Sequence, residues 1–248
     1  MRIRSVDVVV LFFTLILCAG PAFGQFGIFD NEADWELVGD FKEPGGVSVS
    51  GTGEEAVYTL EGNGDCFCDS NYDDEGYYVY KMLEGSWSLQ ARVSLKDLGY
   101  GPWGSAGVMI RENPEDPNSR HYSVVYQSND QGAQTQNIYR NLVAFPGLPT
   151  EVFTTPDGQP VVDPGNGVWV RVTHVAPLDL FYSEYSLDGA EWSVGHLQVL
   201  PWGTEQLAYG LAITSLEDSD YVAEAEITGV QFQSPPPIAS RSLSKASF

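Results

Sequence analysis

Carboxylates are the most frequent chemically active side chains in this sequence, with 34 Asp and Glu against 12 Lys and Arg. A glycosidase requires two carboxyl groups about 5–5.5 Å or about 6.5–9.5 Å apart. Glu224 and Glu226 share one face of an extended segment, whereas Glu112 and Glu184 are single candidates with no identified partner. Because the alternation around Glu224 is equally typical of a solvated strand face, we assign no catalytic residue.

Oxygen-bearing side chains are densest between Asp65 and Glu75. The spacing of Asp69, Asn71 and Asp73 resembles the start of a calcium loop, in which alternating positions direct hard oxygen ligands inward. The turn glycine and the final bidentate glutamate of a helix-loop-helix site are both missing. We name these three residues as candidate Ca²⁺ ligands, with a solvated acidic loop as the alternative, and expect no other cofactor.

Sulfur and histidine chemistry is not indicated. In an extended strand Cys66 and Cys68 would lie about 6.6–6.8 Å apart, at the edge of disulfide range. Two thiols also lack the further ligands that a closed zinc site requires. The three histidines show no metal-binding spacing. A Gly-x-Ser-x-Gly nucleophile motif is absent.

Aromatic and basic side chains give the candidate ligand site, because sugar rings pack their C–H faces on aromatic rings while polar groups orient the hydroxyls. Tyr100 and Trp103 lie in a glycine-rich loop just before an apolar strand that ends at Arg111. Trp169 and Arg171 alternate with valines. If the valines face the core, Arg111, Trp169 and Arg171 would share the opposite face. The alternative is that the tryptophans cap the core and the arginines pair with carboxylates.

The formal charge of −22 limits the partners. Nucleic-acid binding needs a basic surface that displaces counterions from phosphates, so we expect no nucleic-acid partner. The same field repels an anionic membrane surface. The hydrophobic content of 43% nevertheless suffices for a folded core.

The N-terminus has the pattern of a secretory signal peptide. Arg2 and Arg4 precede an apolar run of about 12 residues, and Ala22 and Gly24 occupy the small positions of a cleavage site. A run of this length is short for a membrane span. We expect cleavage of residues 1–24, no membrane span afterwards, and a secreted or periplasmic protein. Cleavage would leave 10 basic and 33 acidic residues, a charge of −23.

Period-2 alternation recurs along the rest of the chain, and no convincing helix of 12 residues appears. The sequence predicts strands at 56–60, 77–83, 87–95, 106–111, 121–127, 168–174, 181–187, 192–199, 209–214 and 223–228. Short strands without alternating helices predict an all-β fold, a two-sheet antiparallel jelly-roll sandwich. Asp188-Gly189 predicts a tight hairpin turn.

Domain organisation is simple. Residues 25–233 are expected to form a single domain, in which the Pro- and Gly-rich segment 143–167 is a long loop. Residues 234–248 are expected to be an unstructured tail.

Seven segments together resemble one family: Gly64-Asp65, Tyr78–Tyr80, Leu89–Val93, Ala106–Glu112, Trp169–Val172, Ser186–Trp192 and Gly210–Ser215. They are similar to concanavalin A-like lectin/glucanase jelly-roll domains, related to the β-xylosidase C-terminal domain and the secreted domains of the enolase-regulation group. The resemblance runs from about residue 62 to 232. Cys66-Phe67-Cys68 departs from the family's usual Ile-Trp-Gly, and the loop at 143–167 is longer than usual.

The resemblance implies a lectin/glucanase-like sandwich at or outside the bacterial surface, often attached to carbohydrate-active enzymes, and supplies no catalytic pair. Our leading hypothesis is a secreted, non-catalytic domain that binds an extracellular glycan or another extracellular ligand. The alternatives are a glycoside hydrolase of the same fold and a structural or adhesive surface protein.

Overall fold

The computed structural model describes residues 45–64, 67, 75–97, 104–127, 134–140, 151–152, 167–215 and 222–235, with only the backbone given for 134–140 and 151–152. These residues form the following strands: β1 (Gly46–Ser50), β2 (Val57–Gly62), β3 (Tyr77–Glu84), β4 (Trp87–Asp97), β5 (Ser105–Arg111), β6 (His121–Gln127), β7 (Gln134–Arg140), β8 (Glu151–Val152), β9 (Val168–Val175), β10 (Leu180–Ser186), β11 (Ser193–Val199), β12 (Gln206–Thr214) and β13 (Ala223–Gln233). Two short 3-10 turns, η2 (Gly53–Glu55) and η3 (Ala176–Leu178), are the helical elements of the described chain.

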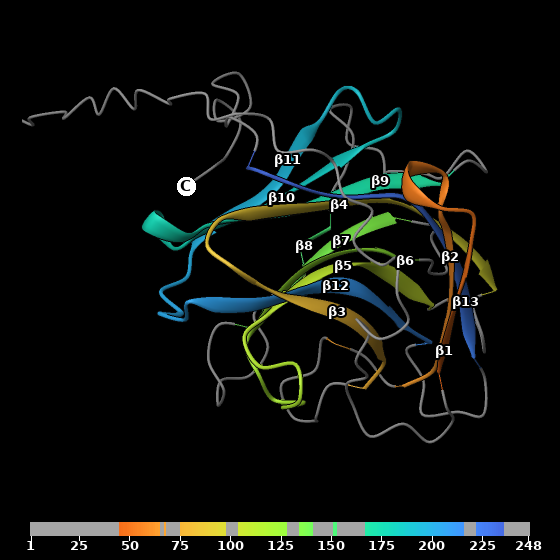
Figure 1. The fold of residues 1–248 in the computed structure, drawn as a ribbon, viewed down its shortest axis with the longest axis horizontal. Helices are drawn as coiled ribbons and strands as arrows, with labels where there is room; N and C mark the ends of the chain where they lie inside the picture. Colours follow the sequence, from red (N-terminus) through yellow and green to blue (C-terminus); the bar gives the residue numbers. More distant parts are fainter. Residues whose placement is uncertain are drawn as a thin grey trace, which may run out of the picture.

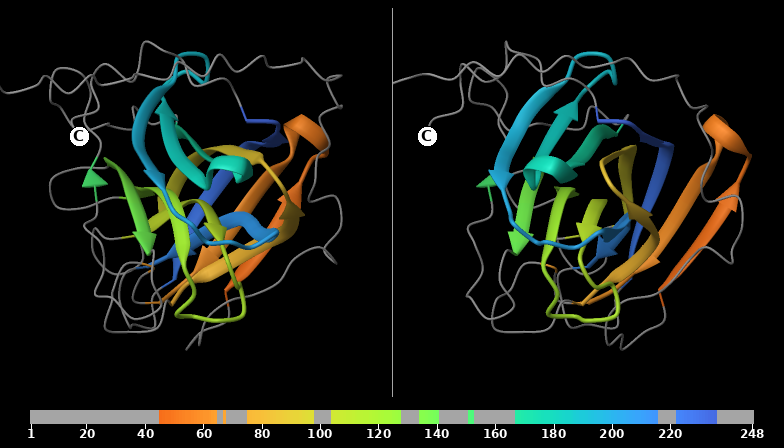
Figure 2. Two further views of the ribbon diagram at one scale, coloured as in Figure 1. Left: turned by 90° about the vertical axis from the view of Figure 1, so that its left-hand side faces the viewer. Right: turned by 60° about the vertical axis from the view of Figure 1, so that its left-hand side comes forward.

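The strands form two antiparallel sheets. The seven-stranded sheet has the order β1-β2-β13-β4-β9-β10-β11, and the six-stranded sheet has the order β3-β12-β5-β6-β7-β8. Figure 1 shows them as two layers, with β4, β9, β10 and β11 lying over β3, β5, β6 and β12. Figure 2 shows β1 and β11 at opposite edges of the larger sheet. The prediction of an all-β, two-sheet antiparallel jelly roll is confirmed.

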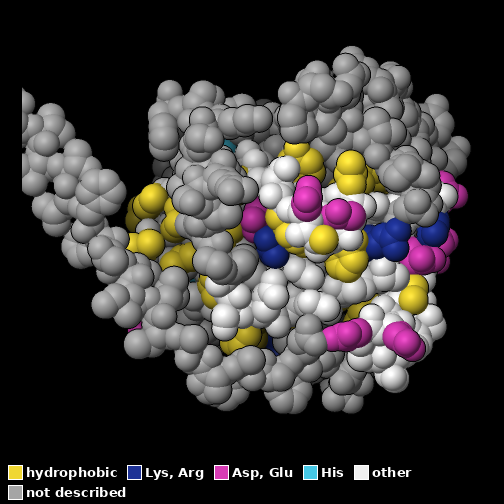
Figure 3. All heavy atoms as spheres, turned by 90° about the horizontal axis from the view of Figure 1, so that it is seen from above, with side chains coloured by type: hydrophobic (Ala, Val, Ile, Leu, Met, Phe, Trp, Pro, Cys, Tyr) yellow, Lys and Arg dark blue, Asp and Glu magenta, His cyan; other side chains and the backbone are white. Residues whose placement is uncertain are grey.

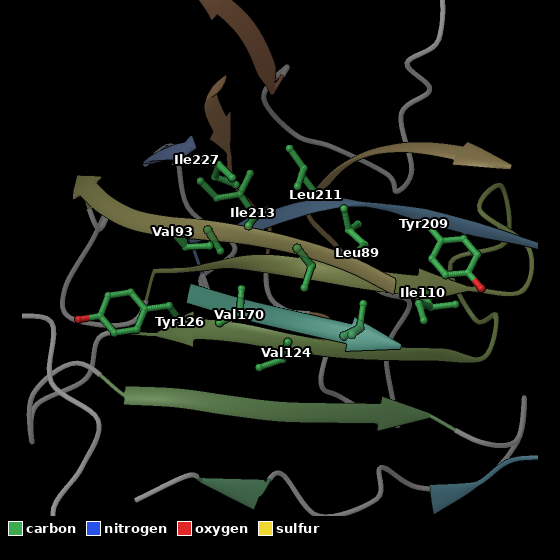
Figure 4. Packing of buried hydrophobic residues seen from close by; sticks show 14 of the residues in the cluster. Leu89, Val93, Ile110, Val124, Tyr126, Val170, Tyr209, Leu211, Ile213 and Ile227 are labelled. Carbon is green, nitrogen blue, oxygen red and sulfur yellow. The ribbon is translucent and has the colours of Figure 1, made fainter. Parts of the chain in front are cut away.

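The core lies between the two sheets and follows from the period-2 pattern. Alternate residues of each strand enter it, among them Leu89 and Val93 of β4, Val170 of β9, and Val124 of β6, all fully buried (Figure 4). The residues between them point to the outer face of their own sheet. Strand alternation therefore determines which side chains are available for a site.

Some predicted elements differ from the structure. The predicted hairpin at Asp188-Gly189 forms, because β10 pairs antiparallel with β11. Its connection is longer than a tight turn: residues 187–192 join the two strands, and the Asp188 carboxylate accepts hydrogen bonds from the backbone N–H groups of Ala190 and Glu191. The segment 143–167 contains the two-residue strand β8. The signal peptide (1–24), and nearly all of the tail (234–248), lie outside the described residues.

His174 gives the fold a pH dependence. The residue is 3% exposed, and its ring stacks on Phe181 with 4.4 Å between ring centroids and places Nδ1 3.4 Å from the Tyr209 hydroxyl. Burial lowers the pKa of His174 from 6.5 to about 4, although the Asp179 charge and a hydrogen bond with the Gly85 backbone act in the opposite direction. The folded protein therefore holds this imidazole neutral at pH values where the unfolded chain protonates it.

We expect this difference to destabilise the folded state as the pH falls from about 6.5 to about 4. The contribution of the neutral His174 to the free energy of unfolding is fully present above its pKa in the unfolded chain, about 6.5. About 3 kcal/mol of this contribution is lost as the pH falls through the pKa in the folded state, about 4. His174→Gln cannot titrate. Urea denaturation at pH 7, 5.5 and 4 gives the difference in the free energy of unfolding between wild type and His174→Gln. This difference should shift against wild type by roughly 2–3 kcal/mol from pH 7 to pH 4. If the difference in the free energy of unfolding between wild type and His174→Gln did not depend on pH, the lowered pKa of His174 would be contradicted.

Candidate functional site

The sequence-predicted ligand residues do not lie on one face. Arg111 ends β5 in the six-stranded sheet, whereas Trp169 and Arg171 belong to β9 in the seven-stranded sheet. Val168, Val170 and Val172 face the core, so Trp169 and Arg171 point to the outside of their sheet. The expectation that all three share a face is wrong, because alternation gives the face of a strand and not its sheet. Tyr100 and Trp103 lie outside the described residues.

Arg111 supports a turn. Its side chain is fully buried, Nε donates to the Asn113 carbonyl at 3.3 Å, and Nη2 donates to the Asp116 carbonyl at 2.6 Å. These bonds hold the connection between β5 and β6. A guanidinium used in this way contributes to local structure, so we assign Arg111 no ligand contact.

The outer face of the seven-stranded sheet carries a polar surface built by strand register. Directly paired residues of β13, β4, β9 and β10 form three rows across the sheet. The first row is Thr228, Arg92, Trp169 and Ser186; the second is Gln231, Gln90, Arg171 and Glu184; the third is Gln233, Ser88, Thr173 and Tyr182. We call these residues the polar face. Figure 3 looks onto this side of the molecule, where basic, acidic and apolar side chains lie close together.

The second row is a hydrogen-bonded network. Arg171 Nε donates to Glu184 Oε2 at 2.6 Å, and Arg171 Nη1 lies 3.5 Å from Gln90 Oε1. Gln90 Nε2 donates to Gln231 Oε1 at 3.1 Å, and Gln90 Oε1 also accepts from Gln233 Nε2 at 3.1 Å. Each amide is thereby oriented before any ligand arrives.

Trp192 covers the second row. The Arg171 guanidinium carbon lies 3.9 Å from the centroid of the Trp192 ring, within the range of a cation–π contact. Trp192 Nε1 donates to the Gly189 carbonyl at 3.1 Å, which ties the ring to the β10–β11 connection. The ring is half-buried. It therefore combines a fixed position with access to solvent.

Trp169 is enclosed by two glycines with positive φ. A Cβ built on Gly189 would lie 2.8 Å from Trp169 Cε2, and one built on Gly229 would lie 2.4 Å from Cη2. The φ angles are 77° and 59°, which L side chains rarely adopt. Gly229 lies where the pairing of β13 with β4 changes register. The backbone at both positions thus leaves room for the half-buried indole.

Burial shapes the acid–base properties of the polar face. It raises the pKa of Tyr182 to about 12, while a hydrogen bond with Thr173 acts in the opposite direction. Thr173 Oγ1 also lies 2.6 Å from Ser88 Oγ. In the exposed β10–β11 connection, hydrogen bonds from the Glu191 and Ala190 backbone and from Ser186 lower the pKa of Asp188. Tyr182 therefore stays a neutral hydroxyl at physiological pH.

Three of the four candidate carboxylates, Glu226, Glu112 and Glu184, pair with cations. Glu224 and Glu226 point to the outside of the sheet, and Lys96 Nζ lies 3.4 Å from Glu226 Oε2. Glu112 forms a two-point ion pair with Arg120 beside the six-stranded sheet. Glu184 lies about 14 Å from β13, because two strands separate them at about 4.8 Å per step. This spacing is too wide for a glycosidase pair between Glu184 and either β13 carboxylate.

The calcium prediction at Asp69, Asn71 and Asp73 falls outside the described residues and stays a prediction. Where the structure is described, no group of three or more His, Cys, Asp or Glu residues could hold a metal ion. The same part of the chain has no helix that is long and apolar enough to cross a membrane.

Comparison with known proteins gives a fold class. No protein-family model matches the chain, and no curated protein sequence matches it. A functionally unknown protein from Saccharomyces cerevisiae is similar in structure, with a TM-score of 0.61, 16% identity, and coverage of 82% of this chain and 98% of that one. An alginate lyase from Pseudomonas aeruginosa gives a TM-score of 0.51 and 11% identity, over 75% and 86% of the two chains.

A lectin from Bauhinia forficata, solved in complex with GalNAc, gives a TM-score of 0.47 and 10% identity, and covers 86% of this chain and 97% of the lectin. The two antiparallel sheets of this chain form a jelly-roll sandwich, the fold that the resemblance implied. At these identities the likeness concerns the fold.

Sequence reasoning identified Trp169 and Arg171 of this surface. It did not single out Gln90 and Gln231, which belong to the polar face, or Trp192, which lies over Arg171. Trp192 stands in the resembling segment Ser186–Trp192, which was a usable signal. Gln90 and Gln231 gave none, because they are 141 residues apart and meet only through the pairing of β4 with β13.

Proposed function

We propose that this chain is an exported, non-catalytic sandwich that binds carbohydrate on the polar face of its seven-stranded sheet. The observation that carries the proposal is the half-buried Trp192, held against Arg171 beside the linked amides of Gln90 and Gln231. An aromatic ring next to fixed amides and an ion pair is the combination that saccharides require.

Preorganisation favours this surface over an ordinary solvated strand face. Arg171 and Glu184 side chains are only 8% and 12% exposed, so the network does not depend on mobile surface side chains. Trp169 is confined by Gly189 and Gly229. A ligand would meet groups whose conformational entropy is already lost, and less of the interaction energy is then spent on ordering.

The fold agrees with this function without determining it. One structurally similar protein is an alginate lyase, which is compatible with a carbohydrate ligand for this fold. Export through residues 1–24 would place the sandwich where polysaccharides occur outside the cell. Mature protein that begins at Gln25 is the expected result of N-terminal sequencing.

The test compares wild type with Trp192→Ala. Both proteins are assayed for retention on insoluble cellulose, xylan and chitin, for affinity electrophoresis in soluble glucan, mannan and galactan, and on a glycan array. We expect wild type to bind at least one glycan, and Trp192→Ala to bind it about tenfold or more weakly, because a central aromatic is removed.

The control is Met82→Ala, which removes a 39% exposed apolar side chain from the six-stranded sheet. It should bind as wild type does. Circular dichroism establishes that both variants fold. If no glycan is retained by wild type, or if Trp192→Ala binds like Met82→Ala, the proposal is wrong.

A further inference from the structure

The outer face of the seven-stranded sheet carries three Lys or Arg side chains among the described residues, in a chain whose net charge is −22: Arg92 and Arg171 of the polar face, and Lys96 further along β4. Two are neutralised by a carboxylate: Arg171 by Glu184, with Nε and Oε2 2.6 Å apart, and Lys96 by Glu226, with Nζ and Oε2 3.4 Å apart. Arg92 is the third. Among the described residues it has no hydrogen bond, ion pair or ring contact, and its Nε is buried without a partner.

Strand register explains why Arg92 differs from Arg171. The residue opposite Arg171 on β10 is Glu184, which supplies the negative charge. The residues opposite Arg92 are Thr228 on β13 and Trp169 on β9, and neither can ionise to an anion at physiological pH. Because the half-buried Arg92 guanidinium meets no hydrogen-bond acceptor in the described part of the chain, it carries a desolvation cost that an anionic ligand would offset.

We infer that Arg92 is an acid-recognition subsite of the proposed glycan surface, and that it takes the carboxylate of a uronic acid residue. The inference rests on the proposed function. A guanidinium can donate two parallel hydrogen bonds to a carboxylate, and such charge-assisted pairs are about twice as strong as neutral hydrogen bonds. Trp169, directly across from Arg92, offers an indole against which the sugar ring that bears the carboxylate can lie.

The net charge of the protein further restricts the class of acidic glycan that can bind. The charge of −22 repels a dense polyanion over distances of about the Debye length, roughly 8 Å at physiological salt. A single carboxylate on a mainly neutral glycan experiences less of this repulsion and still gains the contact with Arg92. The ligand class is therefore a neutral saccharide chain with isolated uronate residues.

The test uses tetrasaccharides that each contain one glucuronate or galacturonate residue, together with their carboxyl-reduced counterparts, in which CH₂OH replaces the carboxylate. Binding is measured by isothermal titration calorimetry in about 0.15 M salt. We expect wild type to prefer at least one acidic form about tenfold or more over its reduced form, the effect of one charge-assisted hydrogen-bonding contact. Arg92→Gln should reduce this preference to less than about twofold, and Arg92→Lys should retain part of it.

Lys96→Gln is the matched control. It removes one positive charge from the same strand and the same face, but from a side chain already paired with Glu226. It should keep the preference for the acidic form. Equal losses in Arg92→Gln and Lys96→Gln would show a general charge effect and overturn the inference.

The outcomes also separate the inference from the proposed function. If wild type binds acidic and reduced forms equally, and Trp192→Ala weakens both, the surface binds glycans and Arg92 is not an acid-recognition subsite. If wild type binds neither these tetrasaccharides nor any glycan in the broader panel, both proposals fail.

Discussion

Replacement of Glu184 by alanine is expected to lower the free energy of unfolding by about 3–5 kcal/mol, the range for removing one partner of a buried ion pair. Glu184 accepts the 2.6 Å hydrogen bond from Arg171 Nε, and both side chains are largely buried. The variant leaves the guanidinium under Trp192 with the Gln90 amide oxygen, 3.5 Å away, as its remaining acceptor in the described structure. An uncompensated charge at such a position is costly because water no longer solvates it.

Equilibrium denaturation in urea measures this loss, and Glu226→Ala is the control. Glu226 also pairs with a cation, Lys96, but their side chains are 42% and 43% exposed. Removal of a solvent-exposed pair should cost no more than about 1 kcal/mol. The double variant Arg171→Leu/Glu184→Leu should be less destabilised than Glu184→Ala, because it leaves no charge unpaired. Similar losses for Glu184→Ala and Glu226→Ala would contradict the buried-pair interpretation.

Gly229→Ala is expected to destabilise the sandwich by about 2–4 kcal/mol, from backbone strain and overpacking together. The φ angle of 59° costs an L residue about 1–2 kcal/mol. The added methyl would also lie 2.4 Å from Trp169 Cη2, so the indole must move from its place on the polar face. The tryptophan emission of the protein should change in the same variant, because the surroundings of Trp169 change.

Gly53→Ala separates the two contributions. Gly53 has a closely similar φ of 62°, and a Cβ built there meets nothing within 4 Å. The control should therefore lose only the backbone part of the stability, about 1–2 kcal/mol. Comparable melting temperatures for the two variants would indicate that Trp169 is free to move away from Gly229, contrary to the confinement described above.

The strands were readable from the sequence because alternation is a local signal. Trp87–Leu95 shows apolar residues at every second position, and β4 begins at Trp87 and extends two residues beyond Leu95. The segment that forms β7, Gln134–Arg140, has no such pattern, and β8 is only two residues long. β7 and β8 are recognised as strands because they pair with neighbouring strands, and this pairing cannot be read from the sequence.

The site was only partly predictable, because the pairing of strands is not visible in the sequence. Trp169 and Arg171 were correctly assigned to one face of their strand, because Val168, Val170 and Val172 enter the core. The residues that lie beside Trp169 and Arg171 depend on the order of the strands in the sheet. In that order β4 lies between β9 and β13, although β13 begins more than 120 residues after β4 ends. The sequence likewise gave no reason to place Arg111 in the opposite sheet.

The most direct test of glycan binding by the polar face is a titration of the tryptophan indole N–H signals by ¹H–¹⁵N NMR. The chain has six tryptophans, and single Trp→Phe variants assign their signals. The titrant is the tightest-binding oligosaccharide of the glycan panel. We predict that the Trp169 and Trp192 signals shift and saturate together, while those of Trp87, which donates to the Glu84 carbonyl, and of the buried Trp202 stay in place. Saturable binding that shifts other tryptophans and leaves Trp169 and Trp192 unchanged would contradict this account.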